Sequence, residues 1–211
     1  MKSRLYIILF MVLITAVATA AMTGAKVGLQ NRIEQNRAIL EKRLQLEAFG
    51  ILPETPTPAE VDRVWNQRVE EQEWAGEQVL VAWQSQEKET PLAVGIPYRA
   101  IGVWGPFTGL VALDPEFDEI VGFVVYQHQE TPGLGARMTK DEYRAQFRGR
   151  PADQPDEQGR YLVFLPPTAE PSGEREVQAI SGATGTTNGL RDMFNEVLKK
   201  AQNELKPERP W

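Results

Sequence analysis

The chain has 211 residues, with 23 basic and 29 acidic side chains and a formal net charge of −6 at pH 7. All the acidic residues follow Lys26, and this acidic balance excludes electrostatic binding to nucleic acid or to an anionic membrane surface. The sequence contains no cysteine, which excludes disulfides, cysteine-ligated zinc and iron–sulfur clusters held by this chain. Redox chemistry would therefore need an imported cofactor.

Residues 1–26 have the pattern of a membrane anchor. Lys2 and Arg4 precede Leu5–Ala25, a stretch of 21 residues without a charge. About 20 apolar residues are enough to cross a bilayer as a helix, and the basic residues before them place the amino end in the cytoplasm. A cleaved signal peptide is the alternative, because residues 18–20 (Ala-Thr-Ala) resemble a cleavage site. The length of the apolar stretch favours an uncleaved anchor.

Residues 27–58 are expected to form an amphipathic helix followed by a short connection. The helical part, residues 27–48, carries one apolar stripe whose members lie four, seven and four residues apart. The stripe consists of Leu29, Ile33, Leu40 and Leu44. It is expected to pack either on its own domain or on a neighbouring subunit. Three prolines then interrupt the helical pattern, namely Pro53, Pro56 and Pro58.

Residues 59–205 are long enough to form one domain with a substantial core. A polar helical pattern runs over residues 61–73. Strand patterns follow at Val79–Trp83, Leu110–Leu113, Val121–Tyr126 and Tyr161–Leu165. Residues 151–160 contain proline, glycine and several charges and are expected to form a surface loop. The tail, residues 206–211, is polar and proline-rich, so we expect it to be frayed or to dock only in a complex.

Residues 181–187 read Ser-Gly-Ala-Thr-Gly-Thr-Thr and lead into a helical pattern. Apolar residues at three- and four-residue steps define that helix: Leu190, Met193, Phe194, Val197 and Leu198. A helix N-terminus offers free backbone N–H groups and a positive dipole end, which suit a phosphate. The run is not a P-loop, because no lysine follows its glycines, and it lacks GxGxxG spacing. The simplest interpretation is an N-cap supplied by Thr187 or Asn188.

A second informative segment begins where the strand pattern Val121–Tyr126 ends. The residues Glu130-Thr131-Pro132-Gly133-Leu134-Gly135 form a loop signal with one proline and two glycines. His128, the one histidine of the sequence, lies just before it. A lone histidine beside a strand end is more often structural or solvated than catalytic, although its position leaves open a place near a bound cofactor.

These segments together resemble a known family, the FMN-binding domain. Ser181-Gly182-Ala183-Thr184 followed by hydroxyl residues and Asn-Gly is similar to the flavinylation motif of that family. Glu130–Gly135 is similar to its second signature, a loop close to the flavin, and residues 102–109 (Gly-Val-Trp-Gly-Pro-Phe-Thr-Gly) resemble the preceding strand region. The domain occurs in the NqrC component of the Na+-translocating NADH:quinone reductase and in the RnfG component of the Rnf electron-transport complex. The chain departs from the family at Gln178, where the family usually has aspartate.

The resemblance implies an α+β fold, a twisted antiparallel sheet with flanking helices, preceded here by the transmembrane helix. It implies that Thr184 carries FMN through a phosphoester bond. The other expected cofactor-binding residues fall into two groups, the attachment turn and the segments facing it. They are Ser181, Gly182, Ala183, Thr186 and Thr187, and Glu130, Thr131, Gly133, Leu134, Gly135 and Trp104. Trp104 and Phe107 are candidates to stack on the flavin ring, although such aromatics more often belong to a core.

The function implied is that of an electron-carrier subunit, which relays electrons through FMN and is not catalytic alone. The expected partners are the other subunits of the membrane complex and a separate flavin transferase that attaches the cofactor. The domain is expected outside the bacterial inner membrane. Trp104, the Asn188-Gly189 pair and the helix after the anchor favour the quinone reductase over the Rnf complex. Two other classes are kept: a membrane-anchored scaffold without flavin, and a periplasmic flavoenzyme with noncovalent FMN.

Overall fold

The structure, a computed structural model, describes residues 2–211, with side chains from Arg4 onward. Met1, the first residue of the expected anchor, lies outside the described part. The chain divides into two compact units, residues up to Leu40 and residues Glu41–Trp211.

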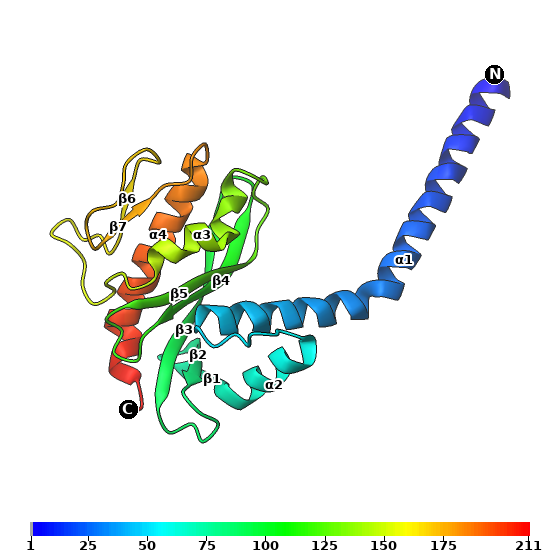
Figure 1. The fold of residues 1–211 in the computed structure, drawn as a ribbon. Coiled ribbons are helices and arrows are strands. Elements are labelled where there is room, and N and C mark those ends of the chain that lie inside the picture. Colours follow the sequence, from blue (N-terminus) through cyan, green and yellow to red (C-terminus); the bar gives the residue numbers. More distant parts are fainter. Residues whose placement is uncertain (1) are drawn as a thin grey trace. The chain divides into compact units, whose positions relative to one another are not determined.

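The first unit is helical, and its helix continues into the second. Helix α1 spans Lys2–Ala48 without a break, which is consistent with the absence of proline before residue 53 (Figure 1). Its most apolar 18-residue window has a mean hydropathy of 2.5 and is 0% buried, so α1 is long and apolar enough to cross a membrane. Of the expected stripe, Leu29, Ile33 and Leu40 are 51%, 51% and 49% exposed. The residues of α1 and its end that enter a core are instead Leu46, Ala48 and Phe49.

The second unit is built on a five-stranded antiparallel meander in the order β1-β2-β3-β4-β5. The strands are β1 Val69–Trp74, β2 Glu77–Trp83, β3 Pro91–Ile101, β4 Pro106–Leu113 and β5 Ile120–Gln127. Each strand is joined to the next by a short connection, so neighbours in the sequence are neighbours in the sheet. The expected α+β class with an antiparallel sheet is therefore confirmed.

Strand β1 corrects one expectation. The helical pattern over residues 61–73 ends early, because helix α2 spans only Pro58–Arg68 and residues from Val69 pair with β2 from Val69↔Ala82 to Trp74↔Glu77. Ala75 and Gly76 form the two-residue turn between them, with φ of 52° and 80°. Two successive positive φ values are those of a tight hairpin turn. Strand pairing here outweighs a polar sequence with little β propensity.

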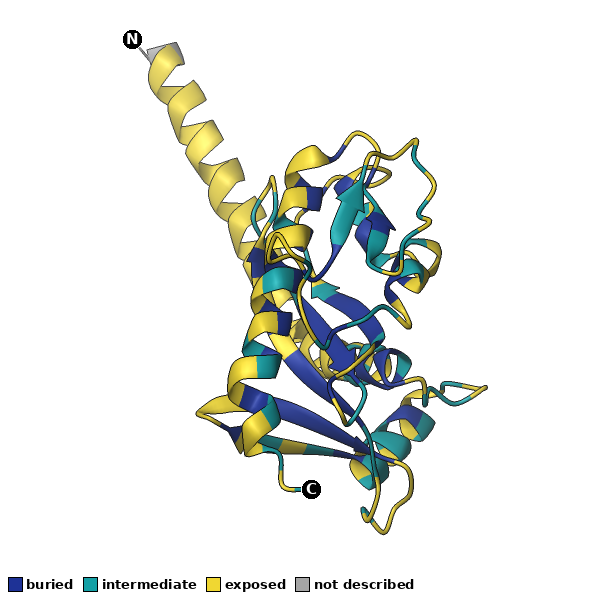
Figure 2. Cartoon of the chain, turned by 90° about the vertical axis from the view of Figure 1, so that its left-hand side faces the viewer, coloured by how far each residue is buried: buried dark blue, intermediate teal, exposed yellow. Residues whose placement is uncertain are grey.

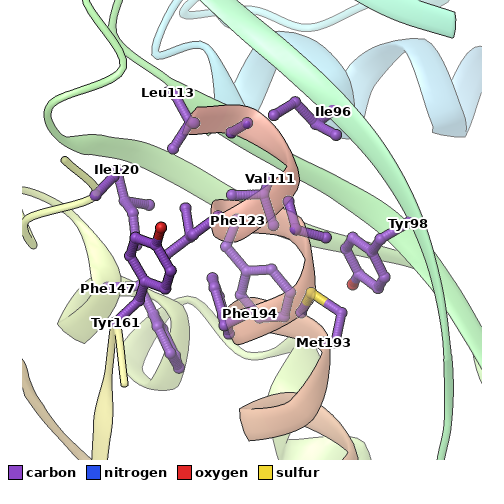
Figure 3. Packing of buried hydrophobic residues seen from close by; sticks show 14 of the residues in the cluster. Ile96, Tyr98, Val111, Leu113, Ile120, Phe123, Phe147, Tyr161, Met193 and Phe194 are labelled. Atoms are coloured by element: carbon purple, nitrogen blue, oxygen red, sulfur yellow. The ribbon is translucent and has the colours of Figure 1, made fainter. Parts of the chain in front are cut away.

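Helices cover both faces of the sheet (Figure 1). Helix α4, Thr184–Lys200, buries the expected apolar stripe on one face. Phe194 of α4 lies 4.6 Å from Phe147 and 5.1 Å from Phe123 between ring centroids. Figure 3 shows these side chains within the buried cluster. On the other face, a Cβ on Gly95 would meet Phe49 at 2.7 Å, which shows how closely the end of α1 approaches β3. Figure 2 shows the strands as the most buried layer and the outer side of α4 as exposed.

Between β5 and α4 the chain forms short elements and a small second sheet. Turns of 3-10 and α-helix occur at η1 Gly135–Thr139, α3 Asp141–Arg144 and η2 Ala145–Phe147. The expected strand near residues 161–165 is β6, Val163–Leu165, which pairs in parallel with β7, Glu176–Gln178. Residues 152–160 contain no helix or strand, in agreement with the expected loop.

The tail corrects a second expectation. After η3, Ala201–Leu205, and η4, Lys206–Glu208, the chain returns to its own domain rather than fraying. The Trp211 ring packs edge-on against Trp74 and Trp83, with centroids 5.3 and 6.1 Å apart. Arg209 donates to the carbonyl oxygen of Pro115 at 3.1 Å. The apolar ring and these polar contacts hold residues 206–211 in place.

Candidate functional site

Three segments that are distant in the sequence meet at the start of helix α4. They are residues 101–105, which run from the last residue of β3 to the start of β4, residues 128–135 after β5, and residues 181–187. A Cβ on Gly185 would lie 2.5 Å from Val103 Cγ2, and a Cβ on Gly182 would lie 3.0 Å from Leu134 Cδ2. The turn that carries Thr184 therefore lies between the other two segments.

The attachment turn ends in a helix that no side chain caps among the described residues. Helix α4 begins at Thr184, with Ala183 at the N-cap position and Gly182 at φ +72°. The expected cap by Thr187 or Asn188 is wrong, because the helix begins three residues before Thr187. The Thr187 hydroxyl instead accepts the backbone N–H of Ile180 at 3.0 Å. The first N–H groups of α4 are therefore left without a side-chain acceptor, which makes this end of the helix suited to an anion.

The hydroxyls of the turn differ sharply in exposure. Thr184 and Ser181 are exposed. Thr186 is 0% exposed and Thr187 is 5% exposed, and both hydroxyls are engaged in hydrogen bonds. Among the three threonines, only Thr184 is exposed and therefore accessible to a reactant outside the protein.

A buried carboxylate joins the three segments. Glu130 is 6% exposed. Its Oε2 accepts the hydroxyl of Thr186 at 2.6 Å, and its Oε1 accepts the backbone N–H of Trp104 at 3.2 Å. The sequence alone did not indicate this role, because the two donors lie 56 and 26 residues away along the chain.

Two glycines leave room for that carboxylate. A Cβ on Gly102 would come within 2.2 Å of Glu130 Oε1, and one on Gly135 within 2.3 Å of Oε2. His128 supports the same residue from the other side, since its Nδ1 accepts the backbone N–H of Glu130 at 3.1 Å. The histidine thus has a structural hydrogen bond two residues from the site.

The remaining residues of the loop after β5 form its exposed turn. Thr131 and Gly133 are exposed, and Gly133 has φ +78°, a conformation that glycine adopts without strain. The carbonyl oxygen of Thr131 accepts the N–H groups of Leu134 and Ala136, both at 3.2 Å. These bonds turn the chain so that Leu134 faces Gly182.

Large apolar side chains lie exposed around the attachment turn. Val103, Trp104 and Leu134 are 56%, 66% and 44% exposed, and Ile101 beside them is 67% exposed. Phe107, the other candidate for ring stacking, is 0% exposed and packs on Tyr98 in the core. Of the two aromatics, only Trp104 is placed to contact a ligand at the surface.

Gln178 forms its hydrogen bonds with residues outside these three segments. Its side-chain amide donates to the carbonyl oxygen of Ala169 at 2.7 Å, and its backbone N–H donates to Gln146 Oε1 at 2.5 Å. It also lines a cavity of about 280 Å³ with Arg137, Lys140, Glu142, Tyr143, Gln146 and Pro171. The glutamine therefore holds the segment between β6 and β7.

Comparison with known proteins explains this arrangement. Residues 102–199, which contain all three segments apart from Ile101, match the family described as FMN-binding domain. The match covers just under half of the chain and identifies this segment as similar to the FMN-binding domain family.

Curated relatives of the chain are named as components of ion-translocating oxidoreductases. The NqrC component of the Na(+)-translocating NADH-quinone reductase of Chlamydia muridarum is 31% identical over 144 residues, covering 60% of this chain and 43% of that protein. The RnfG-type component of the proton-translocating ferredoxin:NAD(+) oxidoreductase complex of Clostridium ljungdahlii is 30% identical over 116 residues, covering 55% of this chain and 57% of that protein. The chain thus matches about two fifths of the length of the former and just over half of the latter.

Solved structures share the fold. NqrC of Parabacteroides distasonis, from its Na(+)-translocating NADH-quinone reductase, superposes with a TM-score of 0.65 at 21% identity, covering 82% of this chain and 94% of that one. NqrC of Shewanella oneidensis superposes with a TM-score of 0.63 at 20% identity, covering 77% and 91%. These likenesses show that the chain shares the fold of those two proteins.

The residues at the site fit FMN in both of its chemical parts. The uncapped start of α4 suits the phosphate, and glycine at residues 182 and 185 lets Leu134 and Val103 lie close to the backbone on either side of Thr184. The exposed side chains of Val103, Trp104 and Leu134 offer an apolar surface to a flat ring system. FMN supplies reversible electron transfer when bound, while the protein supplies its position and electrostatic environment.

Proposed function

We propose that the chain is the FMN-carrying electron-transfer subunit of an ion-translocating membrane redox complex, with FMN bonded to Thr184 through a phosphoester. One observation carries this proposal. Thr184 presents an exposed hydroxyl at the uncapped start of α4, between Val103 and Leu134. The two kinds of relative, one from a quinone reductase and one from a ferredoxin oxidoreductase complex, support the electron-carrier role.

The position of Thr184 suits formation of a phosphodiester. The Thr184 oxygen forms a bond to the FMN phosphorus and gives its proton to a base of the transferase. The P–O bond of the donor, a phosphoanhydride of FMN, breaks, and the other phosphate-bearing half of the donor leaves with the electron pair. The diester keeps one negative charge beside the helix N-terminus, an interaction worth roughly 0.3–1 kcal/mol at an exposed position. Thr186 and Thr187 are excluded by burial, so Ser181 is the rival hydroxyl. Attachment requires a flavin transferase as a partner.

The surroundings of Thr184 then position the cofactor. Trp104 and Val103 on one side and Leu134 on the other contact the flavin ring and limit its access to water. Thr131 and Gly133 shape the loop that carries Leu134, and Gly182 and Ala183 shape the turn. A covalent link suits a carrier outside the membrane, where a dissociable cofactor would be lost.

Helix α1 gives the proposal its cellular setting. We propose that its apolar part spans the inner membrane with the amino end in the cytoplasm, because Lys2 and Arg4 precede it. The FMN domain then lies outside the membrane, beside the other subunits of the complex. The exposed Leu29, Ile33 and Leu40 are available to such a subunit.

A denaturing gel tests the covalent link directly. The full chain is co-expressed with a flavin transferase, and the gel is viewed under ultraviolet light. We expect a fluorescent band for the wild type and for Ser181→Ala, and a dark band for Thr184→Ala. Because Thr184 is exposed, its removal leaves the fold intact, and circular dichroism of the variant checks this.

Three outcomes contradict the proposal. A dark wild-type band with no bound flavin favours a flavin-free scaffold. Yellow colour that is lost on denaturation favours an enzyme with noncovalent FMN. Fluorescence that survives in Thr184→Ala and disappears in Ser181→Ala moves the link to the rival hydroxyl.

A further inference from the structure

We propose that Glu130 is a positioning residue for cofactor attachment: its carboxylate holds the turn of Thr184 and the loop of Trp104 in place before FMN arrives. The inference rests on the proposed function, because it concerns the same site. It assigns a role to a side chain that is buried and does not itself reach the surface.

The first step of the argument is the chemistry of the two bonds. The carboxylate accepts one backbone N–H, that of Trp104, and one side-chain hydroxyl, that of Thr186. Both donors are neutral, so these two hydrogen bonds bring no positive charge to offset the cost of burying the carboxylate. Hydrogen bonds to a charged group are about twice as strong as those between neutral groups, and they fix geometry accordingly.

The second step is the space that the chain leaves for this group. Glycines stand at residues 102 and 135, and a side chain at either would collide with a carboxylate oxygen. Gly102 belongs to the loop of Trp104, and Gly135 follows Leu134 directly. Both loops are therefore shaped around the same two oxygens.

The third step links the carboxylate to Thr184. Thr186 lies in the first turn of α4, two residues beyond Thr184. Val103, next to Trp104, lies against Gly185, and Leu134 lies against Gly182. Holding Thr186 and Trp104 on one carboxylate therefore fixes the residues on both sides of Thr184. A site shaped in advance loses less entropy when its ligand is attached.

Four variants of the full chain, purified in detergent without flavin, test the proposal. Glu130→Ala removes both acceptors and Thr186→Val removes one donor. Glu130→Gln keeps both contacts, because its amide oxygen accepts from Trp104 and its amide nitrogen donates to the Thr186 oxygen. Gln202→Ala is the matched control, since its side chain donates to two carbonyl groups, of Phe117 and Ala152, outside the three segments.

Two readouts are measured for each variant. The first is the initial rate of covalent FMN incorporation by purified transferase, read from gel fluorescence. The second is hydrogen exchange of peptides covering residues 181–187 and 101–105, measured without flavin or transferase. We expect Glu130→Ala to slow attachment about tenfold, which corresponds to about 1.4 kcal/mol, and to speed exchange in both peptides. The attachment rate of Thr186→Val should fall between those of Glu130→Ala and the wild type. The rates of Glu130→Gln and Gln202→Ala should stay within about threefold of the wild-type rate.

The outcomes separate this inference from the proposed function. If the wild type takes up no covalent FMN, the proposed function fails, and the exchange data alone decide whether Glu130 orders the two segments. Wild-type rates and exchange in Glu130→Ala overturn the positioning role. So does an equal loss in Glu130→Gln, which would assign the effect to charge, or an equal loss in Gln202→Ala, which would assign it to general destabilisation. If Glu130→Ala does not fold, Thr186→Val and Glu130→Gln still decide between these results.

Discussion

Gly135 offers a quantitative test of the packing around the buried carboxylate. In Gly135→Ala the new Cβ would lie 2.3 Å from Glu130 Oε2 and 2.6 Å from Thr186 Oγ1. Both distances are far below van der Waals contact, and both atoms belong to the same hydrogen bond. The methyl group can be accommodated only if that bond lengthens or breaks.

The expected cost follows from these contacts. Loss of a hydrogen bond to a charged group costs roughly 1.5–3 kcal/mol, and overpacking of a filled site costs a similar amount when nothing else relaxes. Replacing glycine by alanine also lowers the conformational entropy of the unfolded chain, which offsets about 0.5–1 kcal/mol of this cost. We therefore expect a net loss of about 2 kcal/mol in the free energy of unfolding, or roughly 4–8 °C in Tm for a domain of this size.

Urea unfolding of the full chain in detergent, followed by tryptophan fluorescence, measures this loss. Gly133→Ala is the matched control: nothing lies within 4 Å of its Cβ, so it carries only the backbone strain of its φ of +78°, about 1 kcal/mol. In a Thr186→Ala background the bond is already absent, and Gly135→Ala should cost about half as much. An equal cost in both backgrounds, or no excess over Gly133→Ala, would refute the reasoning.

Two further predictions concern the core. Trp211→Ala should lower the free energy of unfolding by about 2 kcal/mol, because the half-buried Trp211 ring packs on Trp74 and Trp83. Trp211→Phe should restore most of this free energy. Urea unfolding checks both variants, and no loss in Trp211→Ala would show that the tail is not held. Burial raises the pKa of three tyrosines above the usual value near 10. They are Tyr98, Tyr126 and Tyr143. Because the unfolded chain loses these protons first, this contribution to stability should be complete below pH 10 and should fall as the pH rises further. Absorbance should detect fewer tyrosinates in the native chain than in the unfolded chain at the same pH, and equal numbers would contradict the burial.

The fold could be predicted from sequence where local pattern and final environment agree. Strand β5 lies in the apolar stretch from which it was predicted, and residues 122–125 are buried on both faces of the sheet. The apolar stripe of α4 follows the helical period because one face of the helix is buried in the core. Strand β6 was predicted from its local pattern, whereas strand β1 and the parallel pairing of β6 with β7 were not. The pairing partner rather than the local sequence decides these features. The start of α4 was misplaced because a glycine turn, not a side-chain cap, ends the preceding segment.

The candidate site divides in the same way. Thr184 and Trp104 were predicted as individual site residues from the sequence, and the structure places both at the surface. The burial of Thr186 and the bridging by Glu130 could not be foreseen, because they depend on contacts between residues far apart in the chain. Glycine is the one local signal of such contacts, since Gly102 and Gly135 are needed to admit the carboxylate.

The order of the three segments along the chain has a consequence for biosynthesis. A polypeptide is made from its amino end, and the meander of β1 to β5 can pair strand by strand as it emerges. The segment with Thr184 comes after all five strands, and its helix closes the core. A molecule whose synthesis stops before α4 lacks Thr184, the residue proposed to carry FMN. Under the proposed function, only molecules that have been completed and folded would carry FMN. The bound flavin would therefore distinguish these molecules from incomplete chains before the complex assembles.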